Sequence, residues 1–327
     1  MTAGPGDGGP LVLITDCDHP DVQAERAVFT AAGLDVRLGH CRSEDDVIAA
    51  GAGAVALLVQ YAPVTAGVLA ALPGCLVVGR YGAGLDTIDV AAARTRGVAV
   101  VSVPDYAVQE VSDHAIALIL SLCRQIDGYA RAVRSGRWDL RAQGRVRRLS
   151  TLRLGVVGLG RIGQAVALKA AALGFEVVGC DIVPPAACTV PILDLTELLA
   201  TSDVVTLHVP LSAETFHLID AARLARMRPS TVLVNTSRGG LVDQAALGRA
   251  IAAGQLAGAG LDVLETEPPD PADRLLADER VIITPHVAFY SEESLAELKR
   301  RAAEGIVTAL AGHQAARPGV RAVGQPG

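Results

Sequence analysis

Three side chains that could carry out acid–base chemistry follow predicted strands in the second half of the chain. Arg238 lies in NTSRGGLVD, Glu267 in LDVLETEP and His286 in TPHVAF. A fixed arginine can bind a carboxylate through two hydrogen bonds and polarise the adjacent carbonyl group. A histidine can give a proton to the developing alkoxide, and a glutamate beside its ring keeps it oriented and favours its protonated form. These residue types suit the reduction of a 2-oxo acid.

Each of the three residues also has a simpler interpretation. Arg238 could be a solvated loop arginine, Glu267 a surface carboxylate in an acidic, proline-rich loop, and His286 a hydrogen-bonded structural histidine. The other six histidines lack a comparable setting, although the histidine of LHVPL, His208, is expected near a cofactor. The six cysteines form no C-x-x-C pair and have no metal-ligand spacing, so we expect no metal.

A glycine-rich loop precedes these segments. LGVVGLGRIG over Leu154–Gly163 fits G-x-G-x-x-G at Gly158, Gly160 and Gly163, with an apolar strand before it and an alanine-rich helix after it. The glycines permit a tight turn, close approach to a pyrophosphate and helix–strand packing. Asp181 ends the next predicted strand, where a carboxylate binds ribose hydroxyls and repels a 2′-phosphate. The pattern predicts NAD in preference to NADP, with a packing turn as the alternative.

The elements that must position these residues alternate along the chain. Short β-branched runs are separated by alanine-rich helical segments, which favours parallel sheets with helices on both faces. The long apolar helix predicted at Val108–Ile126 interrupts the pattern, so we expect two α/β domains, the second starting near that helix. Loops after strands should converge, because ligands collect at the carboxyl ends of parallel strands. The predicted strands are Leu11–Thr15, Asp35–Leu38, Ala54–Val59, Leu76–Gly79, Val98–Val101, Arg153–Val157, Glu176–Cys180, Val204–Leu207, Thr231–Asn235, Gly258–Val263 and Val281–Thr284.

The composition narrows the class of protein. Half of the 327 residues are hydrophobic but only 3% are aromatic, and no run reaches the ~18 apolar residues of a membrane-spanning helix. A net charge of −6 gives no overall attraction to nucleic acid or anionic lipid. Six dispersed cysteines are typical of reduced thiols, and the first ten residues carry no pattern of a secretion signal. We expect a cytoplasmic protein without nucleic-acid or membrane partners.

Several independent segments resemble one family. These are RYGAGLDTID, the glycine loop, HVPLSAET, NTSRGGLVD, DVLETEP and TPH, spread over about residues 50 to 311. Together they are similar to the D-isomer-specific 2-hydroxyacid dehydrogenases, which use NAD. The resemblance implies that Arg238 binds the carboxylate and carbonyl of a 2-oxo acid and that Glu267 and His286 form the acid–base pair.

The resemblance also implies a binding site. Asp262 would contact the nicotinamide amide, the backbone of Tyr81–Gly84 would receive the substrate carboxylate, and Arg80 would reach the substrate. The expected cofactor residues are Gly158, Gly160, Arg161, Ile162, Gly163, Asp181, His208, Pro210, Thr215, Thr236, Ser237 and Asp262. The expected substrate residues are Tyr61, Arg80, Tyr81, Gly82, Ala83, Gly84 and Phe289. Arg80 together with Arg238 would suit a substrate with a second anionic group.

The family implies a discontinuous domain map. A substrate domain over 1–103 would be interrupted by an NAD-binding Rossmann domain over 104–286 and resumed over 287–327. Both domains would be Rossmann-like or flavodoxin-like parallel sheets, with the active site in the cleft between them. The family is also dimeric, which implies a homodimer.

Two functions remain open at this stage. VPDYAVQEVSDHAIALIL, RSGRWDL and PHVAFYSEESL resemble the subgroup that contains the C-terminal binding proteins, whose animal members are NAD-sensing scaffolds. Those members carry Trp where this chain has Phe289. The resemblance therefore implies that a smaller side chain lines the substrate pocket here. The intact catalytic set favours an oxidoreductase, and a protein-binding scaffold is the alternative.

An arginine-rich stretch over 124–148 has three interpretations. It could bind nucleic acid, it could be a solvated helix and loop at a dimer interface, or one of its arginines could cross that interface and sense an anionic substrate. Sparse aromatic residues and the acidic character of the whole chain disfavour the first interpretation.

Overall fold

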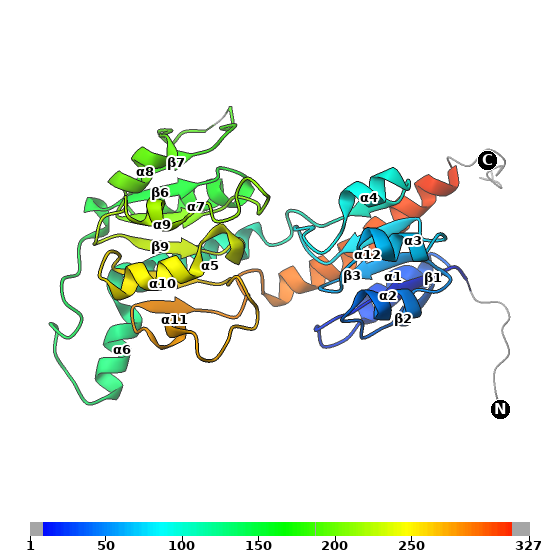
Figure 1. Cartoon of the computed structure of the whole chain (residues 1–327), viewed down its shortest axis with the longest axis horizontal. Coiled ribbons are helices and arrows are strands. Elements are labelled where there is room, and N and C mark those ends of the chain that lie inside the picture. Colours follow the sequence, from blue (N-terminus) through cyan, green and yellow to red (C-terminus); the bar gives the residue numbers. More distant parts are fainter. Residues whose placement is uncertain (1–8, 187, 316–327) are drawn as a thin grey trace. The chain divides into compact units, whose positions relative to one another are not determined.

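The computed structural model describes residues 9–186 and 188–315, and these form two compact units (Figure 1). Unit 1 comprises the chain up to Tyr106 and again from Ser291, and unit 2 is the continuous segment Ala107–Tyr290. The predicted boundaries fell at 103/104 and 286/287. Residues 1–8, on which the expectation about a secretion signal mostly depends, lie outside the described residues.

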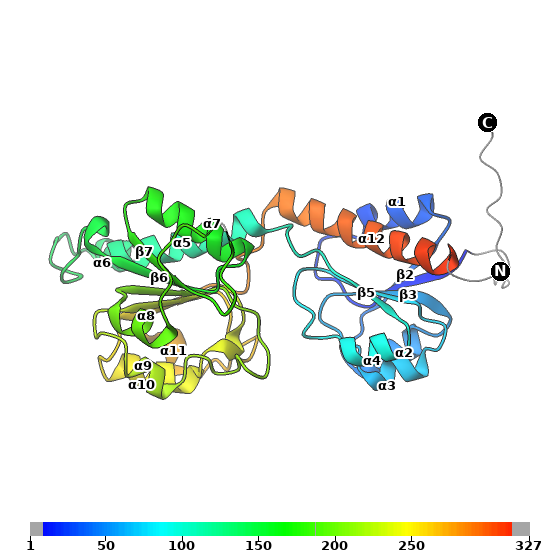
Figure 2. The same ribbon diagram turned by 90° about the horizontal axis from the view of Figure 1, so that it is seen from above.

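Unit 1 is a parallel sheet in the order β2-β1-β3-β4-β5. Figure 2 shows α1 and α12 on one face of this sheet and α2, α3 and α4 on the other. Buried aliphatic side chains fill both interfaces, which is why the strands are apolar on both faces. The elements are β1 (Leu11–Ile14), α1 (Gln23–Ala31), β2 (Asp35–Leu38), α2 (Glu44–Ala50), β3 (Ala54–Val59), α3 (Ala66–Ala71), β4 (Val77–Arg80), α4 (Val90–Thr95), β5 (Ala99–Val101) and α12 (Glu292–Ala315).

Unit 2 is a second parallel sheet, in the order β11-β10-β9-β8-β6-β7. The helices α5 and α7 cover one face and α8 to α11 the other (Figure 2). The elements are α5 (Val108–Arg124), α6 (Ile126–Arg134), β6 (Arg153–Val157), α7 (Arg161–Ala172), β7 (Glu176–Cys180), α8 (Leu195–Thr201), β8 (Val204–Leu207), α9 (Ala221–Leu224), β9 (Val232–Asn235), α10 (Gln244–Ala252), β10 (Gly258–Leu261), α11 (Arg274–Ala277) and β11 (Val281–Ile283).

The prediction of two parallel-sheet α/β domains is confirmed. Every strand predicted from the alternating pattern is present in these sheets, with boundaries that differ by at most two residues. Each sheet reverses its strand order once, between β1 and β3 in unit 1 and between β6 and β8 in unit 2. Ligands of open α/β sheets bind outside the carboxyl ends of strands at such reversals.

The long apolar helix ends earlier than predicted. The helix expected to continue to Ile126 ends at Arg124, because Gln125 adopts a left-handed conformation with φ of 55°. The backbone N–H and the side-chain amide of Gln125 both donate to the carbonyl of Leu122, which closes α5 before α6 begins. No glycine or proline marks this break in the sequence. Within the described residues, no helix has both the length and the apolar character that a bilayer span requires.

Candidate active site

The glycine loop connects β6 to α7 at the strand reversal of unit 2. Gly158 has φ of +93°, and a Cβ there would lie 2.5 Å from the carbonyl oxygen of His208. A Cβ on Gly163 would collide with the carbonyl oxygen of Gly158, so α7 can pack this closely only on a glycine. By contrast, a Cβ on Gly160 would meet no atom within 4 Å. Packing therefore requires glycine at positions 158 and 163, whereas Gly160 faces open space.

That open space fits the pyrophosphate of a dinucleotide. Arg161 and Ile162 lie in the first turn of α7. The free backbone N–H groups and the dipole of a helix N-terminus favour a bound anion. Among the residues that the structure describes, neither the buried hydroxyl of Thr236 nor Nδ1 of His208 has a hydrogen-bond partner. Burial lowers the pKa of His208 to about 4, so its ring is neutral at physiological pH. These unused polar atoms and the open glycine suit the cofactor predicted from the sequence.

Asp181 lies at the end of β7, as predicted. One of its carboxylate oxygens accepts the backbone N–H of Leu159 in the glycine loop at 2.6 Å, and the other accepts that of Val183 at 2.9 Å. The carboxylate thus holds the loop while its side chain stays partly exposed. Thr215, another predicted cofactor residue, closes its own loop by donating to the carbonyl of Pro210 at 2.7 Å.

The loop after β9 presents Arg238. The side chain of Asn235 bridges this loop, because its amide donates to the carbonyl of Arg238 at 2.8 Å and its oxygen accepts the N–H of Ser237 at 3.0 Å. Ser237 also donates its hydroxyl to Leu207 at the end of β8. A Cβ on Gly239 would collide with the backbone of Leu264, so this loop lies directly against the loop after β10.

The loops after β10 and β11 bring the predicted acid–base pair together. Nδ1 of His286 lies 2.7 Å from Oε2 of Glu267, and Oε1 of Glu267 accepts the N–H of Leu264 at 2.9 Å. Both side chains are about one-third exposed, and Phe289 packs edge-on against the imidazole. The imidazole is therefore oriented on one side while its other nitrogen is left for a reacting group.

The electrostatic balance at Glu267 favours its ionised form. Burial alone would raise the pKa of this carboxyl group. The hydrogen bonds from His286 and Leu264, together with the positive charges of His286 and Arg238, outweigh burial and lower the pKa below its ordinary value. Arg238 and the pair are thus close enough to interact through charge.

Asp262 shapes the turn that carries His286. The family resemblance implied only a cofactor contact for this buried carboxylate. Asp262, 1% exposed, accepts the hydroxyl of Thr284 at 2.5 Å, the N–H of Val287 at 3.0 Å and that of Ala288 at 2.8 Å. His114, on α5, lies 2.9 Å from the same Thr284 hydroxyl. These bonds hold His286 in a left-handed backbone conformation, with φ of 54°. No sequence spacing linked His114 to this turn.

Tyr61, a predicted substrate residue of unit 1, lies at the strand reversal of that unit. Asp16, after β1, accepts the backbone N–H groups of Gln60, Tyr61 and Ala62, the closest at 2.6 Å. The hydroxyl of Tyr61 donates to Asp18 at 3.0 Å, and the ring remains exposed. This arrangement fixes the loop that presents Tyr61 at the carboxyl edge of the sheet.

The side chain of Tyr81 is buried inside unit 1. Its ring is 3% exposed and its hydroxyl donates to the fully buried Glu25 at 2.7 Å. Lys299 of α12 lies 3.7 Å from the other oxygen of Glu25. Only the backbone of Tyr81 and of the following Gly82, Ala83 and Gly84 remains for a substrate. The side chain of Arg80 lies against Gly82, where a Cβ would collide with its guanidinium.

Unit 2 thus gathers the predicted catalytic and cofactor residues, together with Phe289, at the carboxyl edge of its sheet. The other predicted substrate residues lie in unit 1, in the loops after β3 and β4. Within the described ranges, no three His, Cys, Asp or Glu side chains are grouped as a metal ion would require.

Comparisons with known proteins agree with this geometry. A family model described as the NAD-binding domain of D-isomer specific 2-hydroxyacid dehydrogenases matches residues 116–288. The chain is 40% identical over 310 residues to D-3-phosphoglycerate dehydrogenase of Mycobacterium tuberculosis, covering 93% of this chain and 57% of that protein. It is 36% identical over 267 residues to glycerate dehydrogenase of Methylorubrum extorquens, covering 80% and 84%. The chain therefore spans little more than half the length of the mycobacterial relative.

A solved structure supports the fold. The D-lactate dehydrogenase of Aquifex aeolicus, complexed with NAD and lactic acid, superposes with a TM-score of 0.84 at 29% identity, covering 96% of this chain and 100% of that chain. These relatives carry the names of enzymes, which favours the oxidoreductase hypothesis over the protein-binding scaffold.

The turn at Asp262 gives a first prediction. Asp262→Asn replaces an acceptor carboxylate with a group that has one acceptor oxygen, so an N–H group of the turn loses its buried partner. The free energy of unfolding should fall by about 2–4 kcal/mol, measured by urea denaturation. Asp270→Asn, at an exposed site, is the control and should change it by less than about 0.5 kcal/mol. Equal effects would contradict the role of the turn.

The glycine loop gives a second prediction. Gly163→Ala should lower the free energy of unfolding by about 1–3 kcal/mol, because the added methyl group collides with the loop backbone. Gly160→Ala should leave stability within about 0.5 kcal/mol but weaken NADH binding at least about tenfold, because the methyl group occupies the open space. Fluorescence titration with NADH measures binding. Normal NADH affinity in Gly160→Ala would refute the cofactor assignment of this loop.

The lowered pKa of Glu267 gives a third prediction. A carboxyl group whose pKa is lowered in the folded state stabilises the protein above its unfolded pKa of about 4.3, and this contribution is lost as the pH falls through the folded pKa. Glu267→Gln removes it, so the Tm difference between wild type and variant should be largest above about pH 5 and shrink towards pH 3.5. Calorimetry at several pH values measures this. Glu197→Gln, at an exposed position, should show no such trend.

Proposed function

Because the chain belongs to the D-isomer-specific 2-hydroxyacid dehydrogenase family, we propose that it is an NAD-dependent oxidoreductase that interconverts a small 2-oxo acid and the D-2-hydroxy acid. The observation that carries the proposal is the 2.7 Å contact between His286 and Glu267, within reach of the charge of Arg238. A protein that only sensed NAD would have no use for an oriented proton donor beside a carboxylate-binding arginine.

The residues have separate roles in the reduction. Arg238 binds the substrate carboxylate and draws electron density from the adjacent carbonyl oxygen. The glycine loop, Asp181 and Thr236 would hold NADH, which would supply the hydride for the carbonyl carbon. His286 gives its proton to the carbonyl oxygen, which completes the hydroxyl group of the product. Glu267, kept ionised, orients the imidazole and compensates its positive charge before transfer.

We propose that the substrate carboxylate also binds the backbone of the segment 81–84. The substrate side chain would lie near Tyr61 and Phe289. Arg80 adds a second guanidinium to this set, which suits a second anionic group on the substrate. Arg80→Ala is then expected to reduce kcat/KM for dianionic 2-oxo acids much more than for pyruvate.

The fourth prediction tests the activity. Purified protein should oxidise NADH in the presence of 2-oxo acids, followed at 340 nm over a panel that includes hydroxylated and phosphorylated members. His286→Ala should lower kcat by about 10²–10⁴-fold, the usual worth of a general acid. His40→Ala, at an exposed position in unit 1, is the control and should match wild type. No NADH oxidation with any acid, or equal rates in both variants, would overturn the proposal.

The proposal includes a homodimer formed through the segment 126–145, which is part of the arginine-rich stretch. Apolar side chains on this segment are exposed, among them Trp138 at 90% and Leu140 at 80%. Exposed aromatic and aliphatic groups concentrated on one segment are typical of a surface that a partner covers. The resemblance to a dimeric family supports the same assignment.

A fifth prediction concerns the dimer. Trp138→Asp should shift the mass measured by light scattering from two chains to one, because a carboxylate in the apolar interface would lose its hydration. Leu168→Asp, on the exposed face of α7, is the matched control and should leave the mass unchanged. A monomeric wild-type protein would contradict the proposed dimer.

A further inference from the structure

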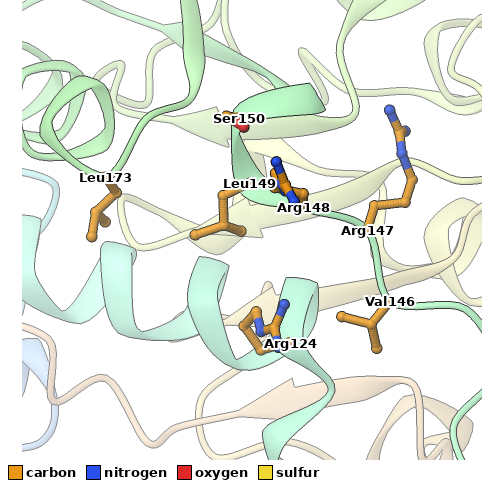
Figure 3. Close-up of a pocket in the computed structure, with 7 residues that line it drawn as sticks. All are labelled: Arg124, Val146, Arg147, Arg148, Leu149, Ser150 and Leu173. Carbon is orange, nitrogen blue, oxygen red and sulfur yellow. The ribbon is translucent and has the colours of Figure 1, made fainter.

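A second concave site lies in unit 2, away from the catalytic loops. It is a pocket of about 540 Å³ between the end of α5, the end of α7 and the segment 146–150 that leads into β6 (Figure 3). Residues that precede β6 and β7 lie at the amino edge of the sheet, whereas the glycine loop and the catalytic loops follow the carboxyl ends of strands. The pocket is therefore separate from the proposed active site.

Three arginines, Arg124, Arg147 and Arg148, are among the residues that line this pocket, and none of its lining residues is acidic. Arg147 is held in place, because it donates to Asp203 at 2.6 Å and to the carbonyl of Thr151 at 2.7 Å. Asp203 is buried and also lies 3.7 Å from the guanidinium of Arg228. A single carboxylate thus serves two arginines, and it lies outside the lining of the pocket.

The other two arginines keep their donors available. Across residues 9–186 and 188–315, Arg124 and Arg148 form neither a hydrogen bond through the side chain nor an ion pair. Arg124 ends α5, so the partial negative charge at a helix C-terminus offsets part of its charge. Arg148 precedes a short 3-10 turn and gains no such compensation. Like charges gathered in this way repel one another unless an anion joins them.

We propose that this pocket binds a small multivalent anion with phosphate-type oxygens. Guanidinium groups bind such oxygens through paired hydrogen bonds, and the hydroxyl of Ser150 adds a donor. The remaining wall is apolar, made by Val146, Leu149 and Leu173, so a ligand with a carbon skeleton attached to its phosphate fits better than the free ion. The volume lies in the range of small-molecule sites, and a concave pocket of this size does not match a nucleic-acid duplex.

Calorimetric titration with inorganic pyrophosphate tests the proposal, on protein saturated with NADH so that the cofactor loop is not the site measured. The comparison is between wild type, Arg124→Ala/Arg148→Ala and Arg134→Ala, a variant of the same basic stretch that does not line the pocket. At low ionic strength the double variant should lose at least about tenfold in affinity, and the control should stay within about twofold. Glucose 6-phosphate, as an organic phosphate, should show the same ranking.

Several results would overturn the proposal. Equal affinities in all three proteins would show that the pocket does not hold the anion. A loss of the same size in Arg134→Ala would indicate diffuse attraction to the basic stretch. Tighter binding of a DNA duplex than of pyrophosphate, lost in the double variant, would assign the surface to nucleic acid. Because the readout compares variants of the pocket, a chain without NADH-dependent activity would still give a decisive answer.

Discussion

The carboxylate of Asp262 is the group on which the catalytic geometry depends. It is almost fully buried at the end of β10, and three donors from the next loop converge on it. A buried carboxylate is tolerated only when its oxygens are satisfied, so this loop has little freedom to rearrange. The left-handed backbone at His286 is a consequence of that constraint, and the contact with Glu267 follows from it.

The same physical device recurs at the strand reversal of each sheet. In unit 1, Asp16 collects the N–H groups of the loop after β3, and in unit 2, Asp181 binds the loop after β6. Carboxylates at the carboxyl ends of parallel strands are thus used to order neighbouring loops. Glycines then decide how closely those loops approach, as at Gly239 against Leu264. The parallel strands form the scaffold, and local polar contacts fix the positions of the loops at its carboxyl edge.

The sequence predicted the strands, the glycine loop after β6 and the loops that present Arg238, Glu267 and His286, because periodicity and motif spacing are local signals. It did not predict contacts that join distant segments without a motif. Tyr81 and Glu25 are 56 residues apart, and no motif indicated that the tyrosine hydroxyl would bind a buried glutamate. His114 reached Thr284 through helix packing alone. The break at Gln125 was missed because a left-handed residue there is stabilised by its own side chain, without the glycine that usually reveals it.

The interrupted unit 1 has a consequence for synthesis on the ribosome. Its five strands are translated first, but one face of their sheet packs against α12, which is translated only after the whole of unit 2. Until then, Val12, Ile14 and Val77 lack part of their apolar cover, whereas unit 2 is continuous and can fold as soon as it emerges. The nascent chain therefore exposes part of this apolar sheet face until α12 has been synthesised.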